Sequence, residues 1–397
     1  MPISLTRSLL KATGLTRMGR LMDATRLIQR ALGSAGMPAA EPVAQPMARP
    51  MRKTSAETLP DTSTIILPPP HSVPQPAAND DVMRRPAHPN FSEQSFAFEG
   101  KTYPYRLFVP KRADAGDEGA LRESMPLVVL LHGCKQDALD FSKGTAMNAL
   151  AGKEQCLVLY PEQISRANLQ MCWNWFDPGH QQEGTGEPGM ITALTRSVLD
   201  TDFNGRRADS SRVYIAGLSA GGAMAAVVAG LHPELFTALG VHSGLPAGAA
   251  NNVMSAFQAM RRGGQGKGKD KGALAMPTIV FHGDGDTTVH PSNGENIAAD
   301  ALAALRKADT PLTKTQSSTY PEGERAERND KPTDKLTDKL TELTRYANAD
   351  GKSFIEYWSI NNGPHAWSGG SKEGSYTDPD GPSASKAMLA FFLQHRK

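Results

Sequence analysis

The chain has 397 residues, of which 39% are hydrophobic and 21% are charged, and its formal net charge is +2. This length suffices for one large domain with extensions, and the near-neutral charge gives no reason to expect a nucleic acid as a partner. No apolar run reaches the length that spans a membrane. The three cysteines, Cys134, Cys156 and Cys172, are too few for a disulfide framework but leave one bridge open.

The first segment, residues 1–33, is basic. Residues 3–32 carry six basic side chains against one acid, Asp23, and apolar residues recur there at helical spacing. We predict an amphipathic helix that either contacts a granule or membrane surface or docks on its own domain or a partner. The scattered charges exclude the apolar core of a signal peptide, which favours a cytoplasmic location.

The second segment, residues 34–90, is rich in proline. It contains twelve of the chain's 29 prolines. Such a composition cannot supply a packed core, so we predict an extended, disordered linker. The remaining residues, 91–397, form the predicted catalytic domain.

In this third segment, short apolar runs alternate with helical patterns. We predict strands at residues 94–98, 101–109, 126–131, 156–160, 213–216, 236–242, 278–282 and 354–359, and helices at 140–152, 190–201, 220–228 and 383–395. This alternation implies a mostly parallel sheet covered by helices on both faces. Two inserts interrupt it: we predict a flexible segment at 263–272 and a solvated loop with one short helix at 312–346.

The pentapeptide Gly217-Leu218-Ser219-Ala220-Gly221 joins a predicted strand to a predicted helix. A serine between strand and helix lies on a sharp turn, and glycines two residues away on either side remove side chains that would clash there. The turn lifts the hydroxyl of Ser219 out of the sheet. We interpret it as a nucleophile elbow.

A serine nucleophile needs an imidazole as base and an acid that orients this imidazole. The expected chain order is serine, acid, histidine, which leaves His290, His365 and His395 as candidates for the base. His290 is too near the acids, and His395 is expected on a solvated helix end, so we choose His365. For the acid we choose Asp286 over Asp284 because it lies deeper in the loop after residues 278–282. The alternative is a metal site, formed by His282, Asp284, Asp286 and His290.

Acyl transfer also requires two donors directed at the oxyanion. We predict the backbone N–H groups of Ala220, which follows the nucleophile, and of Cys134, in the loop after residues 126–131. Three tryptophans, Trp173, Trp175 and Trp367, lie on loops near these elements. They are expected either to line a substrate cleft or to pack the loops together.

Six motifs occur here in the order found in the polyhydroxybutyrate (PHB) depolymerase esterases, and the chain resembles that family over residues 91–397. They are Leu131-His132-Gly133-Cys134 with Gln136-Asp137, Tyr160-Pro161-Glu162-Gln163, Cys172-Trp173-Asn174-Trp175-Phe176, Gly217-Leu218-Ser219-Ala220-Gly221-Gly222, His282-Gly283-Asp284-Gly285-Asp286, and His365-Ala366-Trp367-Ser368-Gly369-Gly370 with Gly374-Ser375-Tyr376-Thr377-Asp378-Pro379. The resemblance implies an α/β-hydrolase fold, the triad Ser219, Asp286 and His365, and an oxyanion loop that contains Cys134.

The resemblance also bears on substrate and location. The family includes feruloyl and acetylxylan esterase-like members, and many members are secreted, which leaves an extracellular location open. We therefore predict a serine esterase without metal or cofactor, acting on polyester or oligoester bonds, with aryl or carbohydrate esters as the alternative. Its expected partners are an ester substrate, polymeric or small, and a granule or membrane surface at residues 3–32, but no nucleic acid.

Overall fold

The computed structural model describes residues 90–112, 124–265, 275–319 and 340–397, all within one compact unit, Pro86–Lys397. The predicted basic helix at 1–33 lies outside the described residues, as does the predicted linker at 34–90 apart from Asn90. In the part that is described, no helix is long and apolar enough to cross a membrane.

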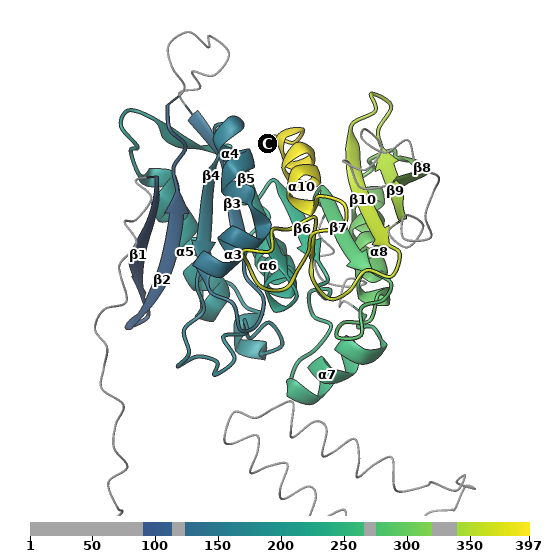
Figure 1. Cartoon of the computed structure of the whole chain (residues 1–397), viewed down its shortest axis with the longest axis horizontal. Coiled ribbons are helices and arrows are strands. Elements are labelled where there is room, and N and C mark those ends of the chain that lie inside the picture. Colours follow the sequence, from purple (N-terminus) through teal and green to yellow (C-terminus); the bar gives the residue numbers. More distant parts are fainter. Residues whose placement is uncertain (1–89, 113–123, 266–274, 320–339) are drawn as a thin grey trace, which may run out of the picture. The chain divides into compact units, whose positions relative to one another are not determined.

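Ten strands of the described residues form one sheet, in the order β1-β2-β4-β3-β5-β6-β7-β10-β9-β8 (Figure 1). They are β1 (Phe91–Phe98), β2 (Lys101–Phe108), β3 (Ser124–Leu131), β4 (Leu157–Pro161), β5 (Arg207–Leu218), β6 (Ala238–His242), β7 (Thr278–Gly283), β8 (Thr313–Thr319), β9 (Thr341–Ala347) and β10 (Ser353–Ile360). The six central strands, from β4 to β10, pair in parallel, whereas the strands at both edges pair antiparallel. The predicted mostly parallel sheet is therefore confirmed.

Helices cover both faces of the sheet, as predicted, and create two apolar cores (Figure 1). One face carries α5 (Gly186–Asp200), α6 (Ala220–Leu231) and α8 (Ser292–Lys307), and the other carries α3 (Ala138–Thr145), α4 (Met147–Lys153) and α10 (Ala384–Leu393). The helix α7 (Val253–Arg262), the 3-10 turn η1 (Pro178–His180) and the short strands β11 (Trp367–Ser368) and β12 (Thr377–Asp378) lie in the connections. Because β3 to β7 and β10 are parallel, their carboxyl ends meet at one edge, where the connections that follow them can form a site.

The structure corrects several predicted elements. Residues 138–153 form two helices and not one, because Ala146 adopts a left-handed backbone with φ of 50°. The insert at 312–346 begins and ends in the antiparallel strands β8 and β9, so the expected loop with one short helix is wrong at both ends; residues 320–339 lie outside the described part. The sequence did not predict these strands because β8, at the edge of the sheet, is made of polar residues. It is held in the sheet by its pairing with β9 and shows no apolar pattern.

His395 is a further correction. It was expected on a solvated helix end, but only 2% of it is exposed, because its ring packs between Phe354 and Phe391. Burial lowers the pKa of His395 to about 4, so the ring is neutral at pH 7.

Candidate active site

Ser219 lies between the end of β5 and the start of α6, with φ of 56° and ψ of −121°. A residue other than glycine in this backbone region is strained, and strain of this kind is held by the structure around it. The neighbouring glycines allow it: a Cβ on Gly217 or Gly221 would overlap backbone atoms, including the carbonyl oxygen of Leu131 on β3. The predicted sharp turn between strand and helix is therefore present, and it presents the Ser219 hydroxyl at the carboxyl edge of the sheet.

The structure brings Ser219 and His365 together from positions 146 residues apart. The Oγ of Ser219 lies 2.9 Å from Nε2 of His365, in the connection after β10. On the other side of the ring, Nδ1 lies 2.7 Å from Oδ2 of Asp286, in the connection after β7. Since a carboxylate accepts the Nδ1–H, Nε2 is left as the acceptor for the serine hydroxyl. This geometry suits removal of the Ser219 proton by His365.

The Asp286 side chain is buried and fully engaged. Its Oδ1 accepts the backbone N–H groups of Thr288 and Val289, each at 2.8 Å. Burial alone would raise the pKa of Asp286, but hydrogen bonds from His282 and His365 and from the backbone hold it well below its ordinary value. Asp284 instead accepts the backbone N–H of Asn362. The geometry therefore places Asp286, and not Asp284, against the imidazole.

Two buried histidines surround this arrangement, and sequence reasoning gave neither a role in it. His282 directs Nε2 to the carbonyl oxygen of Val289 at 2.9 Å and lies 3.5 Å from Asp286 Oδ2. His242 accepts the Ser368 N–H at 3.0 Å. Burial lowers the pKa of His242 to about 3, so it stays neutral and acts as packing behind the site. In the sequence, His242 was marked only by its position at the end of a predicted strand, and His282 was considered only as a metal ligand and as part of a family motif.

The predicted oxyanion donors also lie at this edge. The Ala220 N–H belongs to the first turn of α6, where backbone donors lack intrahelical partners. Within the described residues, neither it nor the Cys134 N–H has an acceptor. The loop of Cys134 is shaped by Gln136, whose Oε1 accepts the Gly133 N–H at 3.0 Å. A lack of protein acceptors is what the predicted role of these two N–H groups requires.

A disulfide joins Cys134 to Cys172, which answers the question that the cysteine count left open. The bond connects the loop after β3 to the loop after β4, 38 residues later. A second link, the hydrogen bond from Lys135 N to Gln170 O at 2.7 Å, lies beside it. The Cys134 backbone is therefore fixed by a neighbouring loop as well as by its own turn.

The expectation that the three tryptophans line a substrate cleft is wrong. Trp173, Trp175 and Trp367 are 0%, 4% and 1% exposed. Trp173 donates its indole N–H to the His132 carbonyl at 3.1 Å, and Trp367 donates to Ser385 Oγ at 3.0 Å while its ring stacks on His242. All three rings are buried, and the indole N–H groups of Trp173 and Trp367 are paired, so these side chains pack the loops together.

The alternative metal site is also not formed by the described side chains. Asp284 accepts the backbone N–H of Asn362, Asp286 accepts backbone N–H groups and the His365 imidazole, and His290 hydrogen-bonds Ser292. Over the described ranges, no group of three or more His, Cys, Asp or Glu side chains has an arrangement that could hold a metal ion.

Comparison with known sequences matches residues 105–310 to the family model described as esterase PHB depolymerase. Poly(3-hydroxyalkanoate) depolymerase C of Paucimonas lemoignei is 36% identical over 203 residues, which are 48% of this chain and 47% of that protein. Feruloyl esterase B of Thermothelomyces thermophilus is 28% identical over 206 residues, 48% of this chain and 66% of that protein. The chain thus covers less than two thirds of the length of either relative.

Among solved structures, the acetyl xylan esterase from Aspergillus awamori aligns with a TM-score of 0.52 at 17% identity, over 76% of this chain and 99% of that one. At this identity the likeness shows the fold alone. The predicted α/β-hydrolase fold is confirmed.

Proposed function

This chain belongs to the PHB depolymerase esterase family, and from that premise we propose that it is a serine esterase in which Ser219, His365 and Asp286 form the catalytic triad. The observation that carries the proposal is the continuous path of hydrogen bonds from the Ser219 hydroxyl through His365 to Asp286. A serine on a strained turn with such a partner is typical of acyl transfer.

In the first half of the reaction, His365 Nε2 takes the hydroxyl proton while Ser219 Oγ bonds to the ester carbonyl carbon. The carbonyl oxygen becomes an oxyanion, which accepts hydrogen bonds from the N–H groups of Ala220 and Cys134. The carbon–oxygen bond to the alcohol then breaks, and His365 returns its proton to the departing alkoxide. The products are a free alcohol and an ester between the acyl group and Ser219.

In the second half, water gives a proton to His365 and attacks the acyl carbon. The same two N–H groups stabilise the second oxyanion. Its collapse breaks the bond to Ser219, whose Oγ recovers the proton from His365, and the acid is released. Asp286 remains ionised throughout and stabilises the imidazolium that forms twice in the cycle, consistent with its depressed pKa.

For the substrate, we propose polyesters or oligoesters of 3-hydroxy acids. The 36% identity to a poly(3-hydroxyalkanoate) depolymerase supports this class. The second candidate is an aryl or carbohydrate ester, supported by the similarity to a feruloyl esterase.

The two candidates are separated by product release from 3-hydroxybutyrate oligomers, amorphous PHB and methyl ferulate. We expect hydroxybutyrate from the first two, and no release by the Ser219→Ala protein assayed alongside. Serine-dependent release from methyl ferulate alone would keep the mechanism and replace the substrate.

We also propose that the basic segment, residues 3–32, binds a polymer granule or an anionic membrane surface. Its charge and apolar periodicity support this role. Deletion of residues 1–36 is expected to abolish cosedimentation with granules or with anionic vesicles. A chain that lacks residues 40–80 but keeps the basic segment is the matched control, and unchanged partitioning after deletion of residues 1–36 would remove this role from the segment.

A further inference from the structure

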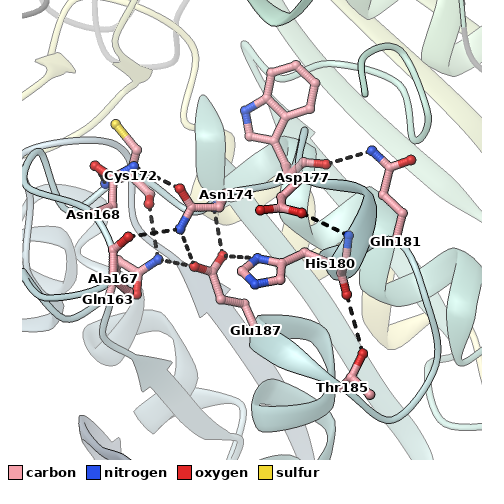
Figure 2. Close-up of polar contacts among 12 residues, drawn as sticks. Gln163, Ala167, Asn168, Cys172, Asn174, Asp177, His180, Gln181, Thr185 and Glu187 are labelled. Carbon is pink, nitrogen blue, oxygen red and sulfur yellow. Dashed lines mark hydrogen bonds and ion pairs between the residues drawn. The ribbon is translucent and has the colours of Figure 1, made fainter. Parts of the chain in front are cut away.

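Glu187 is a buried acid that the proposed mechanism does not use. It lies in the first turn of α5 and is 2% exposed. Its Oε1 accepts the side-chain amides of Gln163 at 2.5 Å and Asn174 at 2.6 Å, and its Oε2 accepts the backbone N–H of Asn174 at 2.7 Å (Figure 2). Nδ1 of His180 lies 3.3 Å from the same Oε2.

This arrangement needs an explanation because burial of a carboxylate is costly. An ion that leaves water loses its hydration, and this cost is offset only where its oxygens accept well-formed hydrogen bonds. The three hydrogen bonds from Gln163 and Asn174 all present N–H donors, which suits a carboxylate that only accepts. The donors, Gln163 and Asn174, are 11 residues apart in the connection after β4, so the carboxylate draws two parts of this connection together at the start of α5.

The stretch that Glu187 holds is attached to the oxyanion loop. Gln163, besides donating to Glu187, donates its side-chain amide to the Cys172 carbonyl at 3.0 Å and its backbone N–H to His132 Nε2 at 3.1 Å. Cys172 carries the disulfide to Cys134. The neighbouring Trp173 donates to the His132 carbonyl at 3.1 Å. Three separate links thus join residues 163–174 to residues 132–134.

We infer that Glu187 is a positioning residue for the oxyanion hole: it fixes residues 163–174, which in turn fix the backbone N–H of Cys134. The inference rests on the proposed function. An oxyanion donor acts mainly in the transition state, so a displaced Cys134 N–H lowers kcat more than it raises KM. A misplacement of about 1 Å in such a site costs up to about 100-fold.

Glu187→Gln is the direct test because it keeps the shape and changes the donor pattern. Glutamine has an NH2 group in place of one carboxylate oxygen, so at least one donor from Gln163 or Asn174 would face another donor. With p-nitrophenyl acetate, we expect kcat to fall between about tenfold and about 100-fold while KM changes less than about twofold. Affinity for an alkyl boronic acid, which forms a tetrahedral adduct on the serine, is expected to fall in parallel.

Glu356→Gln is the matched control. Glu356 on β10 is also buried, at 5% exposure, and accepts Arg345 Nε at 2.9 Å and Trp358 Nε1 at 3.0 Å. Its partners lie on the strands β9 and β10, away from the links to Cys134. We expect this variant to lower the melting temperature while its kcat stays within about twofold of wild type. An equal loss of kcat in both variants at an equal loss of stability would overturn the positioning role.

Asn174→Ala covers the case in which Glu187→Gln does not fold. It removes one donor and leaves the carboxylate with Gln163 and a backbone N–H. We expect a smaller fall in kcat, and unchanged kcat in every folded variant would overturn the inference.

Hydrogen exchange separates failure of the positioning role from failure of the proposed function. If the wild type lacks serine-dependent hydrolysis, the esterase proposal fails. Faster hydrogen exchange at residues 132–136 in either variant would then still support the positioning role of Glu187. Unchanged exchange would refute that role.

Discussion

Replacing Ser219 with alanine is expected to lower kcat by on the order of 10⁶-fold, the size of the loss when a triad serine is removed. The substitution deletes the only protein atom that bonds to the acyl carbon in the proposed mechanism. It leaves the oxyanion donors of Ala220 and Cys134 in place, so a small rate above that of water persists. The measurement is kcat for a soluble ester at enzyme concentrations high enough to detect the residual rate.

Folding is expected to survive this change. Alanine meets the same backbone strain as serine at a φ of 56°, so the melting temperature should stay close to that of wild type. Ser219→Gly is the matched control: it is equally inactive but relieves the strain, and we expect it to be the more stable of the two. Activity near the wild-type level in a well-folded Ser219→Ala protein would refute the triad.

The second large effect concerns the acid. Asp286→Asn is expected to lower kcat by about 10⁴-fold, because an amide facing Nδ1 favours the wrong tautomer of His365. Asp284→Asn, two residues away, replaces a side chain that accepts only a backbone N–H from Asn362 among the described residues, and we expect less than a tenfold loss. The reverse order of effects would move the role of the acid to Asp284.

Acid stability gives a second readout of Asp286. Its pKa lies below the ordinary value of 3.8, so its ionised form stabilises the fold at any pH above that value. This contribution is lost as the pH falls below about 4 toward the depressed pKa. Asp286→Asn lacks the titrating group, so we expect the stability difference between wild type and variant to shrink over that acidic range in denaturant unfolding.

Ser219, Asp286 and His365 could be predicted from the sequence because each lies at the end of an apolar strand or in the connection that follows one. Ser219 comes after β5, Asp286 after β7 and His365 after β10. Parallel strands end at a common edge, so chain order and strand assignment together placed the three side chains near each other. The glycines around Ser219 carried the remaining information, since only their missing side chains permit that turn.

Other features gave no local signal. Whether Trp173 lines a cleft or fills a core depends on which loop covers it. The sequence pattern around Trp173 does not indicate that loop. Glu187 precedes the helix predicted at 190–201, and the contacts that suggest its positioning role come from donors up to 24 residues away in the sequence. His395 was misplaced because its burial comes from Phe354 on another element. The polar strand β8 forms through pairing with β9, which composition alone cannot reveal.

The most direct test of this account is to find where the acyl group attaches. The protein is mixed with p-nitrophenyl acetate, quenched in acid within milliseconds and digested, and its peptides are measured by mass spectrometry. We predict one acetyl group on the peptide that contains Ser219 and none in the Ser219→Ala protein. Rapid ester hydrolysis with the acetyl group on another residue would contradict the proposed mechanism. So would an unmodified Ser219 peptide in a protein whose deacylation is slow enough to follow.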